Sequence, residues 1–321
     1  MVSDYARPTQ FTRKAIFLLA NLVAIVAIVF WIRDNISLSA VVDQIKSLPM
    51  QGLCLSLLLS VAVLLVYGAR LALLLSAAWL PALAIVTIGF GMNGVLPFRL
   101  GEVAKLAYAR QFFRVATPRL IAATTAEKLM DLCALFLLGL LASQIVVAPY
   151  LNRGIAIAGL LVAALVLALI VAFLALARWE RSGRETHNWI NDAFATLREQ
   201  KDKARITRLS VLTAMIWAIT IASVFFMFNS VFAQFSLANA LVLSLVLALA
   251  IAIPSTPAGI GVVEAAIVAY LQQTLQAEPN LALASALAFH FIVAMPQILA
   301  TLIILLAFGF NRRVLHRPPS G

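Results

Sequence analysis

The stretch Asn93-Gly94-Val95-Leu96-Pro97-Phe98-Arg99-Leu100-Gly101-Glu102 interrupts a chain that is otherwise almost continuous hydrocarbon. Its two glycines and its proline break the hydrogen-bond pattern of an ordinary membrane-spanning helix. In lipid, each freed backbone N–H or C=O group costs several kcal/mol unless protein or trapped water satisfies it. Arg99, Glu102 and Lys105 follow at spacings of three and are predicted to share one helical face. Charges at membrane depth normally face a polar cavity, so this broken, charged segment predicts a site.

A second broken segment, Pro254-Ser255-Thr256-Pro257-Ala258-Gly259-Ile260-Gly261-Val262-Val263-Glu264, lies about half the chain further on. Proline and glycine again lead into a single glutamate, and the two glutamates are 264 − 102 = 162 positions apart. Apolar segments that are interrupted in this way at corresponding positions of two halves are typical of transporter sites built from inverted repeats. We therefore predict hinge or backbone roles for the interrupting residues, which are Gly94, Pro97, Gly101, Pro254, Pro257, Gly259 and Gly261.

The composition excludes a soluble domain. Hydrophobic residues make up 63% of the 321 residues and charged residues only 12%, and the mean hydropathy is +1.01. The formal charge of +11 comes from Lys and Arg in short segments between apolar runs, without a nucleic-acid-binding motif. It therefore indicates membrane topology and anionic lipid, and no nucleic-acid partner. No His, Cys and carboxylate set has zinc spacing, so we expect neither a metal nor a cofactor; Cys54 and Cys133 are expected to be small buried side chains.

Six apolar runs are long enough to cross a bilayer core of about 30 Å as helices. They lie at 15–32, 52–76, 119–143, 154–177, 207–233 and 281–309. The broken segments, 82–110 and 237–276, are each predicted to form a helical hairpin that enters the membrane and returns. The predicted fold is thus an all-α polytopic membrane protein with six full spans and two re-entrant hairpins. Eight full spans are the alternative, because both pieces of the second hairpin are long enough to cross.

Lys and Arg in short connections place both termini in the cytoplasm, and we expect the chain in the cytoplasmic (inner) membrane. The chain 1–321 then forms a single transmembrane domain of two inverted halves, 1–143 and 154–309, each with three spans and one hairpin. The largest connection, 178–206, is predicted to be cytoplasmic, with an amphipathic helix that could hold a partner protein. A homo-oligomer is compatible with the same pattern.

Three charges, Glu127, Lys128 and Asp131, enter the span predicted over 119–143 together. They are close enough to neutralise one another and either fix helix packing or form a gate or headgroup contact. Glu264 has no basic residue within ten positions, so its partner must come from elsewhere in the bundle or from a substrate.

Two isolated polar residues lie within apolar runs. Arg70 is interpreted as an arginine that reaches the membrane interface, and His290 as a satisfied core histidine. Backbone amides near Gly94 and around 259–261 are predicted to start half-helices, which is a favourable place for a phosphate.

Three segments, "NGVLPFRLGEVAKLAYARQ", "AATTAEKLMDLCALFLLGLLA" and "PSTPAGIGVVEAAIVAYL", together resemble the flippase-like membrane domain of lysylphosphatidylglycerol synthases, the membrane part of the bacterial multiple peptide resistance factor. The resemblance covers nearly the whole chain and implies lipid translocation. The family's elements fall on Asn93, Pro97, Arg99, Gly101 and Glu102, on Glu127, Lys128 and Asp131, and on Pro254, Pro257, Gly259, Gly261 and Glu264. Lys128 stands where the family usually has arginine, which removes bidentate geometry there.

The function expected from these observations is a lipid flippase or transporter of lipid-linked headgroups, with membrane lipids as partners. The aminoacyltransferase domain of the synthases is not found in this sequence, so we expect no enzyme activity. The alternatives are a membrane transferase that acts on a lipid carrier and a non-transporting accessory protein of envelope synthesis. The candidate substrate-binding residues are Asn93, Arg99, Glu102, Lys105, Glu127, Lys128, Asp131 and Glu264.

Overall fold

The computed structural model describes residues 37–146, 202–252 and 256–309, and every regular element within these ranges is helical. The all-α class is therefore confirmed. By length and composition, four helices of the described part are apolar enough to cross a membrane, as expected for a polytopic membrane protein. They are Met50–Leu75, Lys203–Val231, Pro257–Leu275 and Pro279–Ala307.

The elements follow one another as α2 (Leu38–Ser47), α3 (Met50–Leu75), α4 (Trp79–Val95), η1 (Pro97–Arg99), α5 (Gly101–Phe113), α6 (Thr117–Val146), α9 (Lys203–Val231), α10 (Leu237–Ala252), η4 (Pro257–Gly259), α11 (Val262–Leu275) and α12 (Pro279–Gly309). Helices α3, α6, α9 and α12 correspond to the spans predicted at 52–76, 119–143, 207–233 and 281–309. The spans predicted at 15–32 and 154–177 lie outside the described residues, as does the predicted 178–206 loop up to residue 201.

Helix α2 was not predicted, because it lies between the spans predicted at 15–32 and 52–76. Ser37 caps it, since its side chain accepts a hydrogen bond from the Ala40 amide. Only Val41 of its ten residues is buried. A search of the sequence for long apolar runs therefore does not find this helix. The expectation for the cysteines was also wrong, because Cys54 and Cys133 are both exposed on the described surface.

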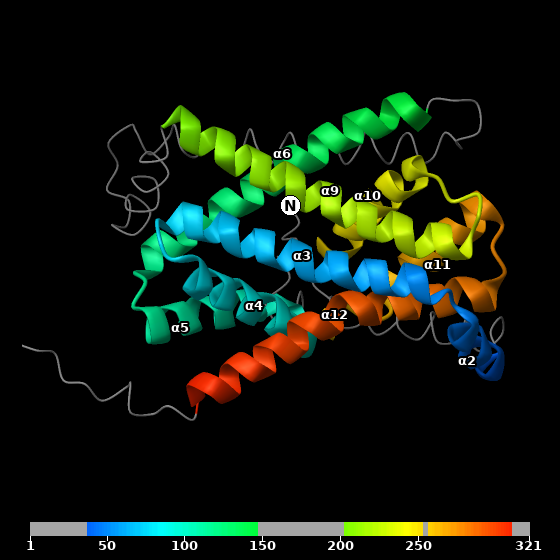
Figure 1. The fold of residues 1–321 in the computed structure, drawn as a ribbon, viewed down its shortest axis with the longest axis horizontal. Coiled ribbons are helices and arrows are strands. Elements are labelled where there is room, and N and C mark those ends of the chain that lie inside the picture. Colours follow the sequence, from blue (N-terminus) through cyan, green and yellow to red (C-terminus); the bar gives the residue numbers. More distant parts are fainter. Residues whose placement is uncertain (1–36, 147–201, 253–255, 310–321) are drawn as a thin grey trace, which may run out of the picture.

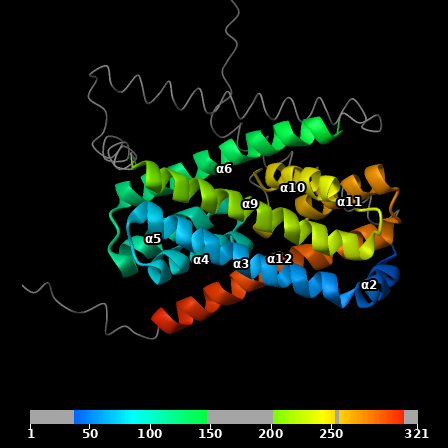
Figure 2. The ribbon, with the colours of Figure 1, turned by 45° about the horizontal axis from the view of Figure 1, so that its top comes forward.

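Two long helices, α3 and α9, run antiparallel and in contact through the middle of the bundle (Figure 1). Helices α4 and α5 lie at one end of the molecule, and α10 and α11 lie at the opposite end, which both views show (Figure 2). Helices α6 and α12 flank the central pair on opposite sides. Each hairpin therefore occupies one end of the long axis.

The contacts of the first four long elements are repeated among the last four. Helix α3 contacts α4 as α9 contacts α10, and α4 contacts α5 as α10 contacts α11. Helix α5 contacts α6 as α11 contacts α12, and α4 contacts α12 as α10 contacts α6. An exchange of the two halves thus leaves this set of contacts unchanged.

The two breaks share their backbone path as well as their proline. Phe98 and Arg99 of η1 both have φ of 57°, and Ala258 and Gly259 of η4 have φ of 56° and 79°. Such left-handed residues end one helix and turn the chain into the next. Because η1 contacts η4, and α4 also contacts η4, the two breaks lie against each other, although no residue of η1 or η4 is fully buried.

Two hydrophobic cores support the breaks from either end. One gathers around Leu71, Ile85 and Leu120, and the other around Phe228 and Ile267. The outward side chains are also apolar and largely exposed, among them Leu58, Phe291 and Ile303. Apolar residues on both sides of the same helices are the pattern of a bundle surrounded by lipid.

Candidate functional site

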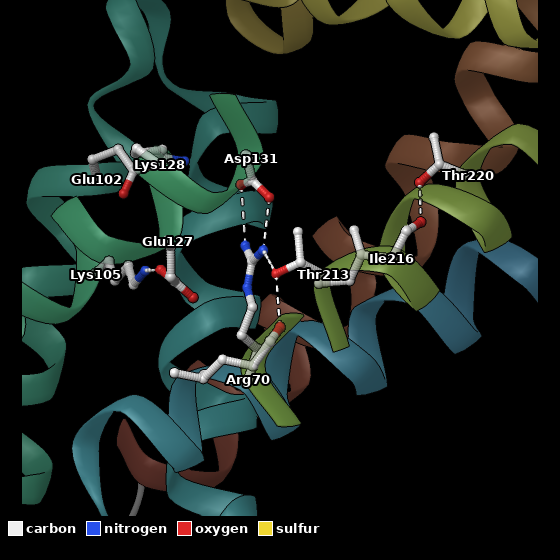
Figure 3. Close-up of polar contacts among 10 residues, drawn as sticks. Arg70, Glu102, Lys105, Glu127, Lys128, Asp131, Thr213, Ile216 and Thr220 are labelled. Carbon is white, nitrogen blue, oxygen red and sulfur yellow. Dashed lines mark hydrogen bonds and ion pairs between the residues drawn. The ribbon is translucent and has the colours of Figure 1, made fainter. Parts of the chain in front are cut away.

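Three ion pairs join α3, α5 and α6 next to the first break (Figure 3). Their members, which we call the charged cluster, are Arg70, Glu102, Lys105, Glu127, Lys128 and Asp131. All of them except Arg70 are residues that the sequence selected. The charges of the cluster balance, with three cations and three carboxylates.

Arg70 joins the charged cluster from α3 and is completely buried. Its Nη1 donates to Asp131 Oδ1 at 2.7 Å and its Nη2 to Asp131 Oδ2 at 3.0 Å, a bidentate pair between α3 and α6. Nη1 also donates to Thr213 Oγ1 on α9 at 3.2 Å, and the guanidinium lies 4.9 Å from the centre of the Tyr67 ring. The interpretation of Arg70 as an interfacial arginine was therefore wrong.

A second pair is formed by Lys105 of α5 and Glu127 of α6, where Nζ donates to Oε2 at 2.8 Å. Both side chains are buried, with exposed fractions of 7% and 5%. Gly89 of α4 makes room for the lysine stem, because a Cβ atom at this glycine would lie 3.2 Å from Lys105 Cδ. The third pair, Lys128 Nζ to Glu102 Oε1 at 3.3 Å, is more exposed.

The expectation that Glu127, Lys128 and Asp131 neutralise one another was also wrong. Each of them pairs instead with a residue of another helix. The physical reason is that α6 packs against both α3 and α5, so opposite charges from those helices lie closer than the neighbours on α6. The pairs consequently hold three helices together.

A small cavity of about 10 Å³ lies within the charged cluster and is lined by Arg70, Glu102, Lys105, Glu127 and Lys128 together with Tyr67 and apolar residues of α4. It has space for about one water molecule. Three buried atoms of its walls, Arg70 Nε, Glu102 Oε2 and Glu127 Oε1, have no hydrogen-bond partner within the described part of the chain. The cavity wall therefore offers one unused donor and two unused acceptors.

Arg99 belongs to η1 and not to α5, which begins at Gly101. The prediction that Arg99, Glu102 and Lys105 share one helical face was therefore wrong for Arg99, because its left-handed backbone turns the chain between it and α5. Glu102 and Lys105 are both on α5, as expected. Arg99 remains beside the charged cluster in sequence, at the break.

Asn93 stabilises the first break, since the Gly101 amide donates to its Oδ1 at 2.8 Å. In the second break the Gly261 amide donates to Glu264 Oε2 at 2.7 Å. These amides at the starts of α5 and α11 are therefore already bonded within the protein. The predicted phosphate site was wrong for Gly94, which lies within the last turn of α4 and starts no half-helix. It is not supported at Gly261, whose amide is already bonded to Glu264.

Gly101 lies against the backbone of α4, so a side chain there has no room. A Cβ atom at this position would be 2.2 Å from the Gly89 carbonyl oxygen and 2.5 Å from the Asn93 amide nitrogen. We expect Gly101→Ala to destabilise the protein by about 1–3 kcal/mol, measured as the free energy of unfolding in detergent, because backbone must move. Gly139→Ala is the matched control: nothing lies within 4 Å of its Cβ position, and it should be neutral or stabilising. Equal stabilities of the two variants would contradict the close approach.

Glu264 lies apart from the charged cluster and does not line its cavity. Its Oε1 is 2.6 Å from His290 Nδ1 on α12. Of the two expected sources of a partner, the bundle and a substrate, the structure shows the bundle. His290 is thereby satisfied. Pro257, Gly259 and Gly261 form the turn that precedes Glu264, and Gly261 has φ of 89°, while Pro254 lies outside the described residues.

The structure thus brings together five of the eight candidate substrate-binding residues in ion pairs. Asn93, Arg99 and Glu264 take part in none of these three pairs. Sequence reasoning did not select Arg70 or Thr213 for the site. A signal for Arg70 was present, because it is the one charged residue of α3 and lies deep in an apolar run. No comparable signal marks Thr213.

Comparison with known proteins gives one family. The sequence matches the family described as the lysylphosphatidylglycerol synthase TM region over residues 18–301. The match includes both breaks, the charged cluster and the Glu264 and His290 pair. A search of curated proteins gives no match to the chain.

Proposed function

The chain belongs to the family of lysylphosphatidylglycerol synthase transmembrane regions, and from this premise we propose that it moves a phospholipid or lipid-linked headgroup between the two leaflets of a membrane. Membership ties the chain to lipid and cell-envelope synthesis. The family name refers to a lysine-bearing phospholipid. We infer the headgroup that this chain binds from the residues of its own site and not from that name. We propose transport without chemical change, and therefore no enzyme activity.

The observation that carries this proposal is the buried charged cluster with its polar cavity. Placing the four largely buried charges of Arg70, Asp131, Lys105 and Glu127 in an apolar bundle has a large desolvation cost. Well-packed apolar residues often stabilise a protein as much as or more than a buried ion pair does. Ionisable residues inside a membrane bundle mark substrate or ion pathways. The three unpaired wall atoms leave hydrogen-bonding capacity for a polar guest, which in this conformation is limited to the size of one water molecule.

A headgroup that carries both a phosphate and a cationic group suits this cluster best. Its phosphate would form an ion pair with Lys105, and with Arg99 at the break. Its cationic group would form ion pairs with the carboxylates of Glu102 and Glu127. Such an exchange of ion pairs leaves the net charge of the buried site unchanged, whereas a singly charged group would add an uncompensated charge. The acyl chains would remain in lipid while the headgroup crosses.

We further propose that α4–α5 and α10–α11 are re-entrant hairpins of an inverted repeat. Their places at opposite ends of the bundle, the repeated helix contacts and the meeting of η1 with η4 support this architecture. The α5 end carries Arg110, Arg114 and Arg119, so we place it in the cytoplasm. Single cysteines at Arg110 and Gln276 should then be labelled from opposite sides of the membrane. Labelling of both from one side would contradict the inverted arrangement. Eight full spans, which the apolar length of Pro257–Leu275 allows, would leave these two positions on opposite sides but would move the second break from the membrane interior to the cytoplasmic side.

The experiment that tests the function uses purified protein in liposomes with fluorescent lipids of defined headgroup. We expect a lipid with both phosphate and amine to become accessible to a membrane-impermeant quencher several times faster than in protein-free liposomes. Leu58→Ala, on the exposed face of α3, is the control variant that should match the wild type. Mass spectrometry of the same lipid separates the alternatives: a product of changed mass would indicate a transferase, and unchanged lipid at the protein-free rate would refute transport.

A further inference from the structure

Glu264 and His290 connect the second break to α12. Glu264 holds the first turn of α11 with one oxygen, which accepts from the Gly261 amide at 2.7 Å, and meets His290 Nδ1 with the other at 2.6 Å. Both side chains are nearly buried, with exposed fractions of 9% and 12%. At this distance a proton must lie between the imidazole nitrogen and the carboxylate oxygen.

The position of this pair repeats that of Lys105 and Glu127 in the first half. Lys105 joins α5 to α6 just after the first break, and Glu264 joins α11 to α12 just after the second. The acid and the base are on opposite helices in the two pairs. In the first half the base is on α5 and the carboxylate on α6, whereas in the second half the carboxylate is on α11 and the base on α12. The base also differs: lysine stays charged over the physiological range, whereas histidine is the side chain that titrates within it.

We propose that Glu264 and His290 form a proton-binding site that holds α11 against α12, as the titratable counterpart of the permanent pair between α5 and α6. With two protons on the imidazole ring, the pair is an imidazolium and a carboxylate, with no net charge and a charge-assisted hydrogen bond. Loss of one proton leaves a neutral imidazole and a net charge of −1. The bond becomes weaker, and the negative charge lies among apolar helices.

Within the part of the chain that the structure describes, the surroundings of this pair offer little that could replace the proton. Helices α4 and α10 carry no ionised side chain, Glu264 is the one such residue of α11, and His290 the one titratable base of α12. The other charged groups on the elements that pack against α12 or meet the second break are Asp43 and Lys46 of α2, Arg70 of α3, Arg99 of η1, and Lys203, Arg205 and Arg208 of α9.

Most of these groups are already engaged. Asp43 and Lys46 pair with each other at the surface, and Arg70 is held by Asp131. Arg205 donates to Leu73 and Ser76 at the far end of α3. Arg99 lies in η1, which contacts η4, and no ion pair is formed between it and Glu264 in the described part of the chain. Proton loss is therefore expected to loosen α11 from α12, while Glu264 Oε2 still accepts from the Gly261 amide.

The test measures how fast a buried cysteine reacts at each end of the bundle. Ile267→Cys on α11 and Ala109→Cys on α5 each replace a side chain with no exposed surface, in a chain whose Cys54 and Cys133 are changed to alanine. Thiol reactivity itself rises with pH, so the quantity compared is the ratio of the two labelling rates. We expect this ratio to increase about fivefold to tenfold between about pH 6 and about pH 8.5, because a charge-assisted hydrogen bond becomes a neutral one.

Two substitutions of His290 separate the proton from the rest of the contact. His290→Gln removes titration and should give the high ratio at both pH values. His290→Lys recreates a permanent pair and should give the low ratio at both. A wild-type ratio that does not change with pH, or a pH dependence that survives in His290→Gln, would overturn the proposal.

A second measurement does not depend on variants of His290 or on lipid movement. The sequence has three histidines, and substitution of His187 and His316 by glutamine leaves the His290 ring as the one imidazole signal in NMR spectra of the protein in nanodiscs. We expect this ring to titrate, and Glu264→Gln to change its midpoint. A ring that does not titrate, or one that is indifferent to Glu264→Gln, refutes the proton site. The proposed transport fails separately, in the liposome experiment.

Discussion

Replacement of Arg70 by methionine is expected to lower the free energy of unfolding by about 3–5 kcal/mol, the usual cost of removing one partner of a buried ion pair. Arg70 is completely buried and donates to both oxygens of Asp131 as well as to Thr213. Without the guanidinium, the carboxylate of Asp131 stays inside the bundle with no cation of its own. The measurement is equilibrium unfolding in mixed micelles of a mild detergent and SDS, followed by circular dichroism.

Matched variants of the same pair separate charge from packing. Arg70→Met combined with Asp131→Leu removes both charges and should recover most of the lost stability, because well-packed apolar residues often replace a buried pair without loss. Arg70→Lys keeps the charge but loses the bidentate geometry, so its stability should be intermediate. Leu58→Ala on the exposed face of α3 controls for a change in that helix. If Arg70→Met alone unfolds like the wild type, the bidentate pair does not hold α3 to α6.

The positions of both breaks could be predicted from the sequence, because proline and glycine change backbone geometry locally. The long helices could be predicted for a similar reason, since apolar length is a local property. The left-handed residues could not. Phe98, Arg99 and Ala258 are not glycines, and their positive φ values come from the turn that the packed hairpins impose. The spacing of three between Arg99, Glu102 and Lys105 therefore predicted one helical face for all three, but Arg99 lies outside α5.

Partners within the site were harder to predict than its members. Lys105 and Glu127 are 22 positions apart, and Arg70 and Asp131 are 61 apart, so no local period links them. Helix periodicity shows which residues share a face, but it does not show which helix that face meets. The carboxylates of α6 were found correctly as a group, yet their partners depended on how α6 packs against α3 and α5. The same limit applies to Glu264 and His290, which the sequence selected separately.

Exchange of the two charges between Lys105 and Glu127 tests whether the charged cluster recognises a headgroup or only fixes the fold. Lys105→Met alone should reduce lipid movement at least about 100-fold, because an unpaired buried carboxylate costs about 3–5 kcal/mol. That loss by itself has two explanations, since the variant is also destabilised. Lys105→Glu combined with Glu127→Lys keeps a buried pair between α5 and α6 but moves the cation from one helix to the other.

The exchanged variant is expected to unfold within about 1 kcal/mol of the wild type and yet to stay at least about tenfold slower in lipid movement, because the phosphate and the cationic group would meet charges of the wrong sign. A tenfold change in rate corresponds to about 1.4 kcal/mol, less than one misplaced buried charge costs. Asp43→Lys combined with Lys46→Asp exchanges an exposed pair of α2 and should change neither property. Wild-type movement in the exchanged Lys105 and Glu127 variant would show that this pair serves the fold alone and that the headgroup site lies elsewhere in the chain.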